Sequence, residues 1–320
     1  MLEPQAEGRT EVSAASIFRT KDGLRAGWRL LIYFSLVVGF YFLLRQALHL
    51  LPSGLSHTLW RDLIGESGLL AVVTLPALLM SAFERRPFGV YGLPAHQAFG
   101  KLFWTGAAWG LVAISCLILS LRGLGDFFFG HIVLHPERAL KFAVFWGVFF
   151  LLVGFFEEFL VRGYTQFTLS QGIYFWPAAL ILSAAFGAIH LGNPGETGVG
   201  ILAAALIGLF LCLTLRRTGT LWFAVGFHAA WDWGESYLYS VPDSGVLVRG
   251  HLLSSSLHGS RWLTGGSVGP EGSLLIFVIL VALFAIFNHT YPQVNTPVVQ
   301  RALVPGAENS LIVPGTDSEL

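Results

Sequence analysis

Long apolar runs recur along this chain and are separated by short polar segments. The first run begins near Trp28, directly behind the basic residues Arg25 and Arg29, and continues to about Leu51. The apolar core of a signal peptide is only about 7–15 residues long, so this longer run predicts a retained membrane span. Seven further runs of spanning length occupy about residues 63–83, 102–121, 140–160, 175–191, 199–215, 219–239 and 273–288.

This pattern predicts an all-α polytopic membrane protein with about eight transmembrane helices, all in one domain at residues 28–289. A polar N-terminal tail covers residues 1–27. A polar, proline-containing tail covers residues 290–320 and is expected to be disordered. Lys and Arg are more numerous on the side of the helices that holds the N-terminus, which predicts a cytoplasmic N-terminus. Gly106 and Gly110 have GxxxG spacing, which allows two helices to pack closely.

Composition supports a membrane protein and excludes several other classes. Apolar residues make up 54% of the 320 positions and charged residues only 12%, whereas an average soluble domain is about 25% charged. The mean hydropathy is +0.66. These values exclude a disordered chain, a basic nucleic-acid binder and a disulfide-stapled secreted domain. The formal net charge is zero, so the overall charge indicates no binding partner, whereas the apolar composition indicates the lipid bilayer.

Ionisable residues inside the apolar runs are the candidates for function, because a charge at the bilayer centre costs roughly 2.5–3.5 kcal/mol. The first cluster is Glu157, Glu158 and Arg162, which follows an apolar run without a break. On a helix, Glu158 and Arg162 are four residues apart in the favourable order for an ion pair. Glu157 points about 100° away and is therefore the less compensated acid, which suits a general base.

Two more clusters follow in the next apolar runs. His190 ends a run of small residues, with Phe186 one turn before it on the same face. His228 and Asp232 are four residues apart, so the carboxylate can hold one ring nitrogen and fix the histidine tautomer. Each cluster alone could be structural. Each of these ionisable side chains needs a polar partner inside the membrane, and one shared interior site would supply partners for all of them.

The three clusters resemble the signature of the CAAX-protease and bacteriocin-processing family of intramembrane proteases, including its type II CAAX prenyl endopeptidases. The family pattern reads Glu-Glu-x-x-x-Arg, Phe-x-x-x-His and His-x-x-x-Asn or Asp. Here it corresponds to Glu157 to Arg162, Phe186 to His190, and His228 to Asp232. The resemblance covers about residues 140–240, a protease-like core.

The resemblance implies hydrolysis of a peptide bond in or beside the membrane. Glu157 would activate water as the general base, and Glu158 with Arg162 would set the local charge. His190 and His228 would either bind a metal, for which zinc fits best, or stabilise the oxyanion without one. Asp232 would orient His228, although prenyl-protein enzymes carry Asn there and a carboxylate repels an oxyanion.

The resemblance also implies the partners, which are a peptide or membrane-protein substrate and the lipid bilayer, with no nucleic acid. The loops resemble those of bacterial membrane proteins, which predicts a bacterial inner or plasma membrane location. Prenylated proteins are not expected as substrates there. Two other functions remain open from the residues. Buried Glu, His and Asp also form proton relays in ion-coupled transporters, and a non-catalytic immunity or binding scaffold could retain the same fold.

One feature of the sequence conflicts with a shared site. With the N-terminus inside, Glu157 lies toward the cytoplasmic end of its helix, whereas His190 lies toward the outer end of the next. Long tilted helices, or a re-entrant segment at residues 192–195, would be needed to bring the two side chains together.

Overall fold

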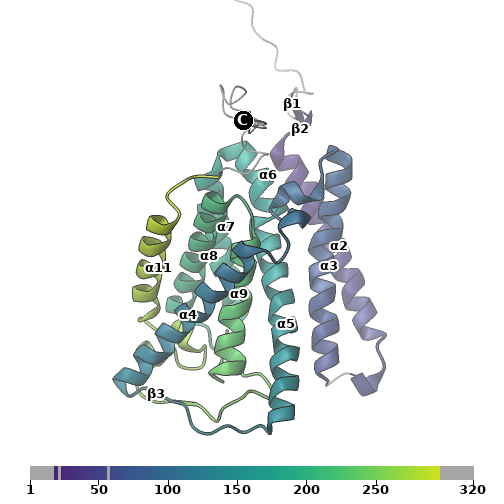
Figure 1. Ribbon diagram of the computed structural model, residues 1–320. Helices are drawn as coiled ribbons and strands as arrows, with labels where there is room; N and C mark the ends of the chain where they lie inside the picture. The colour runs from purple at the N-terminus through teal and green to yellow at the C-terminus, as the bar shows by residue number, and fades with distance from the viewer. Residues whose placement is uncertain (1–17, 21–22, 56–57, 296–320) are drawn as a thin grey trace, which may run out of the picture.

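The computed structural model describes residues 18–20, 23–55 and 58–295, and these residues form a bundle of helices with almost no sheet (Figure 1). The helices in chain order are α2 (Ala26–His49), α3 (Leu59–Glu84), α4 (Lys101–Leu124), α5 (Pro136–Arg162), α6 (Tyr164–Ile173), α7 (Phe175–Ile189), α8 (Gly198–Thr218), α9 (Trp222–Asp232), α10 (Arg261–Thr264) and α11 (Ile276–Thr290). The strands are β1 (Arg19–Thr20), β2 (Gly23–Leu24), β3 (Phe127–Phe128) and β4 (Ser256–Leu257), which pair antiparallel as β1–β2 and β3–β4.

The all-α polytopic fold predicted from the apolar runs is confirmed. Among the described residues, six helical segments are long and apolar enough to cross a membrane, and the fourth joins α5 to α6. The last two expected spans correspond to the shorter helices α9 and α11. Helix α6 was not anticipated, because its sequence is too polar to read as a span. The predicted C-terminal tail lies outside the described residues from 296 onward, as do residues 1–17 of the N-terminal tail.

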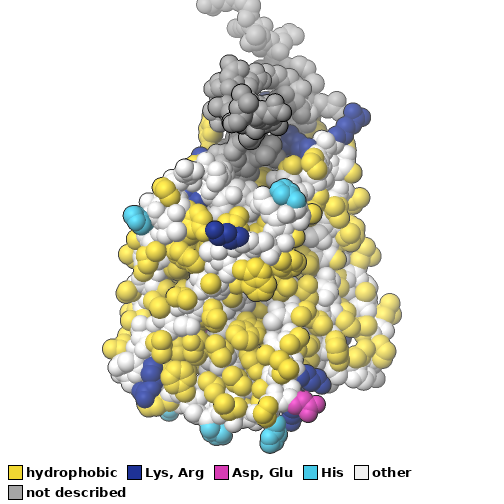
Figure 2. All heavy atoms as spheres, viewed as in Figure 1, with side chains coloured by type: hydrophobic (Ala, Val, Ile, Leu, Met, Phe, Trp, Pro, Cys, Tyr) yellow, Lys and Arg dark blue, Asp and Glu magenta, His cyan; other side chains and the backbone are white. Residues whose placement is uncertain are grey.

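The surface has the distribution of side chains that a bilayer requires. Hydrophobic side chains cover most of the visible face, and Lys, Arg and His lie mainly toward its upper and lower ends (Figure 2). Large apolar side chains such as Leu43, Trp104 and Val281 are at least 65% exposed on the outer helices. A soluble protein rarely exposes a continuous apolar surface of this extent. The chain is therefore an integral membrane protein.

Helix α9 lies at the centre of the bundle, where it packs against α4, α5 and α8, with α4 running obliquely across it (Figure 1). The predicted close packing at Gly106 and Gly110 is found on this contact. A Cβ atom on Gly106 would overlap the carbonyl oxygen of Phe223, and one on Gly110 would overlap that of Phe227. The backbones of α4 and α9 therefore touch directly, which fixes the position of α9.

Replacing Gly110 by Ala is expected to destabilise the protein by about 1–3 kcal/mol, because the new methyl group must push α4 away from α9. Thermal unfolding in detergent measures the effect. Gly123 is the matched control on the same helix, since a Cβ there meets nothing within 4 Å. An equal loss of stability in Gly123→Ala would show that the cost comes from elsewhere than the helix contact.

The lower end of the bundle in Figure 1 is closed by the segment between α9 and α11. Helix α9 continues into a π-helix, Trp233–Leu238, and the chain then forms an irregular loop, α10 and a turn at Pro270–Gly272 before α11 begins. Strand β4 in this segment pairs with β3, which follows α4. These connections hold the long loop against the ends of the helices that carry the site.

Candidate functional site

Glu158 and Arg162 form a completely buried ion pair near the end of α5. Both side chains are 0% exposed, and Arg162 Nη1 donates to Glu158 Oε1 at 2.7 Å. Arg162 Nε also donates to the carbonyl oxygen of Gly208, midway along α8, at 3.2 Å. Glu157 lies on a different face of α5 and is 28% exposed. The structure thus places the arginine on Glu158 and leaves Glu157 free to face the interior space.

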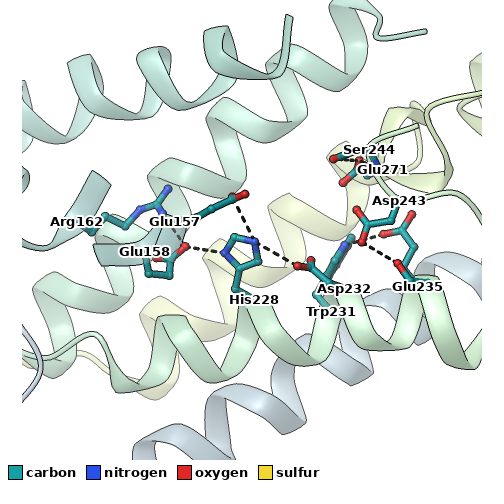
Figure 3. Close-up of polar contacts among 11 residues, drawn as sticks. Glu157, Glu158, Arg162, His228, Trp231, Asp232, Glu235, Asp243, Ser244 and Glu271 are labelled. Carbon is teal, nitrogen blue, oxygen red and sulfur yellow. Dashed lines mark hydrogen bonds and ion pairs between the residues drawn. The ribbon is translucent and has the colours of Figure 1, made fainter. Parts of the chain in front are cut away.

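Three carboxylates surround the imidazole ring of His228, as Figure 3 shows. His228 Nδ1 donates to Glu158 Oε1 at 2.9 Å. The other nitrogen, Nε2, lies 3.6 Å from Glu157 Oε2 and 3.5 Å from Asp232 Oδ2. Helices α5 and α9 therefore bring the first and third motifs of the sequence into direct contact.

The orientation of His228 differs from the sequence-based expectation in one respect. We expected Asp232, one turn along the same helix, to hold a ring nitrogen. The shorter contact instead comes from Glu158 on α5. A residue on the same helix was visible in the spacing, whereas a partner from another helix was not. Asp232 is left beside Nε2, the nitrogen that faces Glu157.

Phe186 connects the second motif to the first. The guanidinium carbon of Arg162 lies 4.9 Å from the centre of the Phe186 ring, and the same ring meets His190 edge to face at 4.8 Å. His190 Nδ1 donates to the Phe186 carbonyl oxygen at 2.8 Å, which fixes the tautomer and leaves Nε2 as an acceptor. The Phe-x-x-x-His spacing thus determines both the position of the His190 ring and which of its nitrogens carries the proton.

A cavity of about 450 Å³ joins the three motifs. Glu157, His190, His228 and Asp232 all line it. Glu157 and His190 line the same cavity although the sequence predicts them toward opposite sides of the membrane, because α7 ends after only 15 residues. Much of the remaining wall is aromatic and is formed by Trp146, Phe149, Phe150, Phe186, Phe227 and Trp231. The cavity extends to the lower rim at Asp62 and Arg249, which are both partly exposed.

A second group of carboxylates, Glu235, Asp243 and Glu271, lies beyond Asp232 (Figure 3). One oxygen of each lies within 4.8 Å of the other two. Burial raises the pKa of Asp243 well above its ordinary range, and the charges of Asp232 and Glu271 raise it further. Burial likewise raises the pKa of Glu271, against opposing hydrogen bonds from Ser244. The three groups therefore cannot all be charged without compensation.

Sequence reasoning missed this group and one further acid, Glu66. The three carboxylates come from a π-helix and two loops, and no local spacing connects them. Glu66 lies on α3, with Oε1 buried and without a hydrogen-bond partner among the described residues. It is close enough to Glu157 for electrostatic interaction. Its position inside an apolar run was the available signal.

The zinc site considered from the sequence can be compared with the donor geometry. Among the described residues, His190 and His228 do not join a third Cys, His or carboxylate ligand in a set whose donor atoms all lie within 4.8 Å; only Glu235, Asp243 and Glu271 form such a set. His228 Nδ1 is already used by Glu158. The residues present do not provide a preformed zinc site, so zinc stays a prediction and no chemical step below depends on it.

Comparison with known proteins supports the sequence motifs. Residues 139–234, just under a third of the chain, match a protein-family model described as "Type II CAAX prenyl endopeptidase Rce1-like". The resemblance to that family is therefore confirmed over the segment that holds all three motifs. The chain shows no match to a curated protein or to a solved structure.

Proposed function

We propose that this chain is an intramembrane endopeptidase, on the premise that residues 139–234 resemble a type II CAAX prenyl endopeptidase. The observation that carries the proposal is the shared cavity, which Glu157, His190 and His228 all line together with several aromatic side chains. Placing ionisable groups in such apolar surroundings costs free energy, so they are usually found where they pair with one another or bind a ligand. A carboxylate that can act as a general base, two histidines and a cavity that can hold a ligand are the features expected of a hydrolytic site.

Glu157 is the general base in this mechanism. It is the one carboxylate of the first motif that is not paired with Arg162, and it lines the cavity. It would take a proton from water as the water oxygen attacks the peptide carbonyl carbon. His190 Nε2 is an acceptor in the tautomer fixed by Phe186. It would accept a hydrogen bond from the other O–H of the water, which orients the water for attack. Glu157 would then return its proton to the leaving amine as the C–N bond breaks.

His228 is the donor that stabilises the oxyanion. Three carboxylates face its ring, which favours the doubly protonated imidazolium, a form in which both nitrogens donate. Glu158 accepts from Nδ1, so Nε2–H is available to the developing negative oxygen. A preorganised donor of this kind typically contributes about 10²–10³-fold in rate. Glu158 and Arg162 act by holding His228 in place.

The aromatic wall favours an extended peptide segment with apolar side chains as substrate, supplied by a membrane peptide or the tail of a membrane protein. We further propose a bacterial inner or plasma membrane location with the N-terminus in the cytoplasm. Basic residues next to the start of α2 and the ends of α3 and α8, such as Arg25, Arg86 and Arg216, support that orientation. Labelling of single cysteines placed at each end of the bundle in intact cells would test it.

A cleavage assay tests the proposed function directly. The purified protein is reconstituted in vesicles with a library of membrane-anchored peptides, and products are identified by mass spectrometry. Cleavage at a defined peptide bond is expected. Movement of protons or ions across the vesicle membrane without cleavage would favour the transporter, and neither activity would favour the binding scaffold.

Replacing Asp232 by Asn is expected to retain cleavage and to raise kcat by up to about tenfold. The amide removes a negative charge near His228 Nε2 and adds a hydrogen-bond donor for the oxyanion. One added hydrogen bond contributes about 1 kcal/mol, which corresponds to up to about tenfold in rate. Asp232→Ala, which removes the charge without adding a donor, is the matched comparison. A loss of more than tenfold in Asp232→Asn would show that the carboxylate itself is required.

A further inference from the structure

We propose that Glu235, Asp243 and Glu271 bind a calcium ion at the lower rim of the cavity. The three side chains come from the π-helix after α9, the loop that follows it, and the turn before α11. One oxygen of each lies within 4.8 Å of the other two. An ion bound here would join three separate segments of the chain next to Asp232.

Each carboxylate is held through one of its oxygens by a donor outside the group. Trp231 Nε1 donates to Glu235 Oε2 at 2.9 Å, and Ser236 Oγ donates to Asp243 Oδ2 at 2.9 Å. Ser244 donates to Glu271 Oε1 from both its backbone nitrogen and its hydroxyl, at 2.7 and 2.8 Å. Among the described residues, the second oxygen of each carboxylate receives no hydrogen bond. Outer donors that orient carboxylates while leaving one oxygen free are typical of metal sites.

The buried side chain of Glu235 is a second and independent indication that this group binds a ligand. Its side chain is 0% exposed, and its Oε1 has no hydrogen-bond partner among the described residues. This oxygen faces the turn that holds Glu271, since it lies 3.3 Å from the position a Cβ would take on Gly269. Within the described part of the chain, none of the three carboxylates forms a salt bridge with Lys or Arg. A buried carboxylate oxygen without a donor is costly, and a cation would satisfy it.

The donor set selects calcium over other common ions. All three donors are oxygens, whereas zinc prefers nitrogen and sulfur. Magnesium binds oxygen at about 2.0–2.1 Å and retains most of its water, whereas calcium accepts several protein oxygens at about 2.3–2.6 Å. Oxygens on opposite sides of a calcium ion are therefore about 4.6–5.2 Å apart, so three oxygens within 4.8 Å of one another are close enough to share one calcium ion.

An ion could reach this position through the cavity, because Asp243 and Glu271 line the same space as Asp232. Binding would fasten the loop after α9 to the turn before α11. It would also place positive charge near Asp232, which reduces the repulsion between that carboxylate and an oxyanion. Calcium would therefore stabilise the lower rim whether or not a substrate is present.

Calcium binding is tested on the full-length protein in detergent after chelation and removal of the chelator. Added calcium is expected to raise the melting temperature, and terbium is expected to bind with luminescence excited through tryptophan, since Trp231 contacts Glu235. Excess calcium should displace terbium, and an equal concentration of magnesium should not. Glu235→Gln and Asp243→Asn are each expected to weaken calcium binding by at least about tenfold.

Glu137→Gln is the matched control, because Glu137 is an exposed acid in the first turn of α5. It should bind calcium and terbium as the wild type does. Size-exclusion profiles without calcium establish that each variant is folded. Wild-type protein with no calcium-dependent shift, or binding that is unchanged in Glu235→Gln, would overturn the proposal and leave three carboxyl groups that share protons. Because binding rather than cleavage is measured, the result is independent of the proposed protease activity.

Discussion

Replacing Glu157 by Gln is expected to reduce cleavage by about 10²–10⁴-fold, the usual contribution of a general base. The amide retains the shape of the side chain but cannot take a proton from water. Stability should change by less than about 1 kcal/mol, since Glu157 is 28% exposed and its contact with His228 is 3.6 Å long. Initial cleavage rates in vesicles and melting curves in detergent measure the two effects on the same sample.

Glu66→Gln provides the sharpest comparison for this result. Glu66 is a second acid close to Glu157, but it comes from α3 and lies outside the three motifs. If Glu157 is the base, Glu66→Gln should retain cleavage within about tenfold of the wild type. Full activity in Glu157→Gln together with loss of activity in Glu66→Gln would transfer the role to the acid on α3.

Replacing Arg162 by Ala is expected to destabilise the protein by about 3–5 kcal/mol and to abolish cleavage. Both members of its ion pair are 0% exposed, so the change leaves the Glu158 charge buried without its partner. The substitution also removes the hydrogen bond to α8 and the contact with Phe186. Chemical or thermal unfolding in detergent measures the loss.

Arg249→Ala is the matched control for Arg162→Ala. Arg249 also lies 3.5 Å from an acid, Asp62, but these two side chains are 62% and 46% exposed, and an exposed pair contributes about 0–1 kcal/mol. A double variant, Glu158→Leu with Arg162→Met, should recover stability by replacing the buried charges with apolar side chains. It should remain inactive because His228 loses its acceptor. An equal cost for Arg162→Ala and Arg249→Ala would contradict the account of the buried pair.

The parts of the fold and site that could be predicted are those that follow from the spacing of residues close together in the sequence. Apolar run lengths located the spans, and the interval from Glu158 to Arg162 correctly paired these two and left Glu157 aside. The GxxxG interval at Gly106 predicted a close helix contact, which α9 provides. In each case the residues that form the pattern lie within about two helical turns or one continuous apolar run.

The parts that could not be predicted depend on contacts between distant segments. Glu158 reaches His228 from another helix, and the acids Glu235, Asp243 and Glu271 meet only because a loop folds back onto the end of α9. Polar loops carry no periodicity that would indicate such a meeting. Helix α6 was missed for the related reason that it is too polar to resemble a span.

The short central helix α9 has a consequence for how the protein responds to its lipid environment. Together with the π-helix that continues it, α9 forms a helix over residues 222–238, which extends about 25 Å and is still shorter than the roughly 30 Å hydrocarbon thickness. Its backbone touches that of α4 directly. Thinner or thicker bilayers act on the outer helices, which tilt to match them. Changes in acyl-chain length should therefore alter how substrates arrive while the geometry around His228 stays constant.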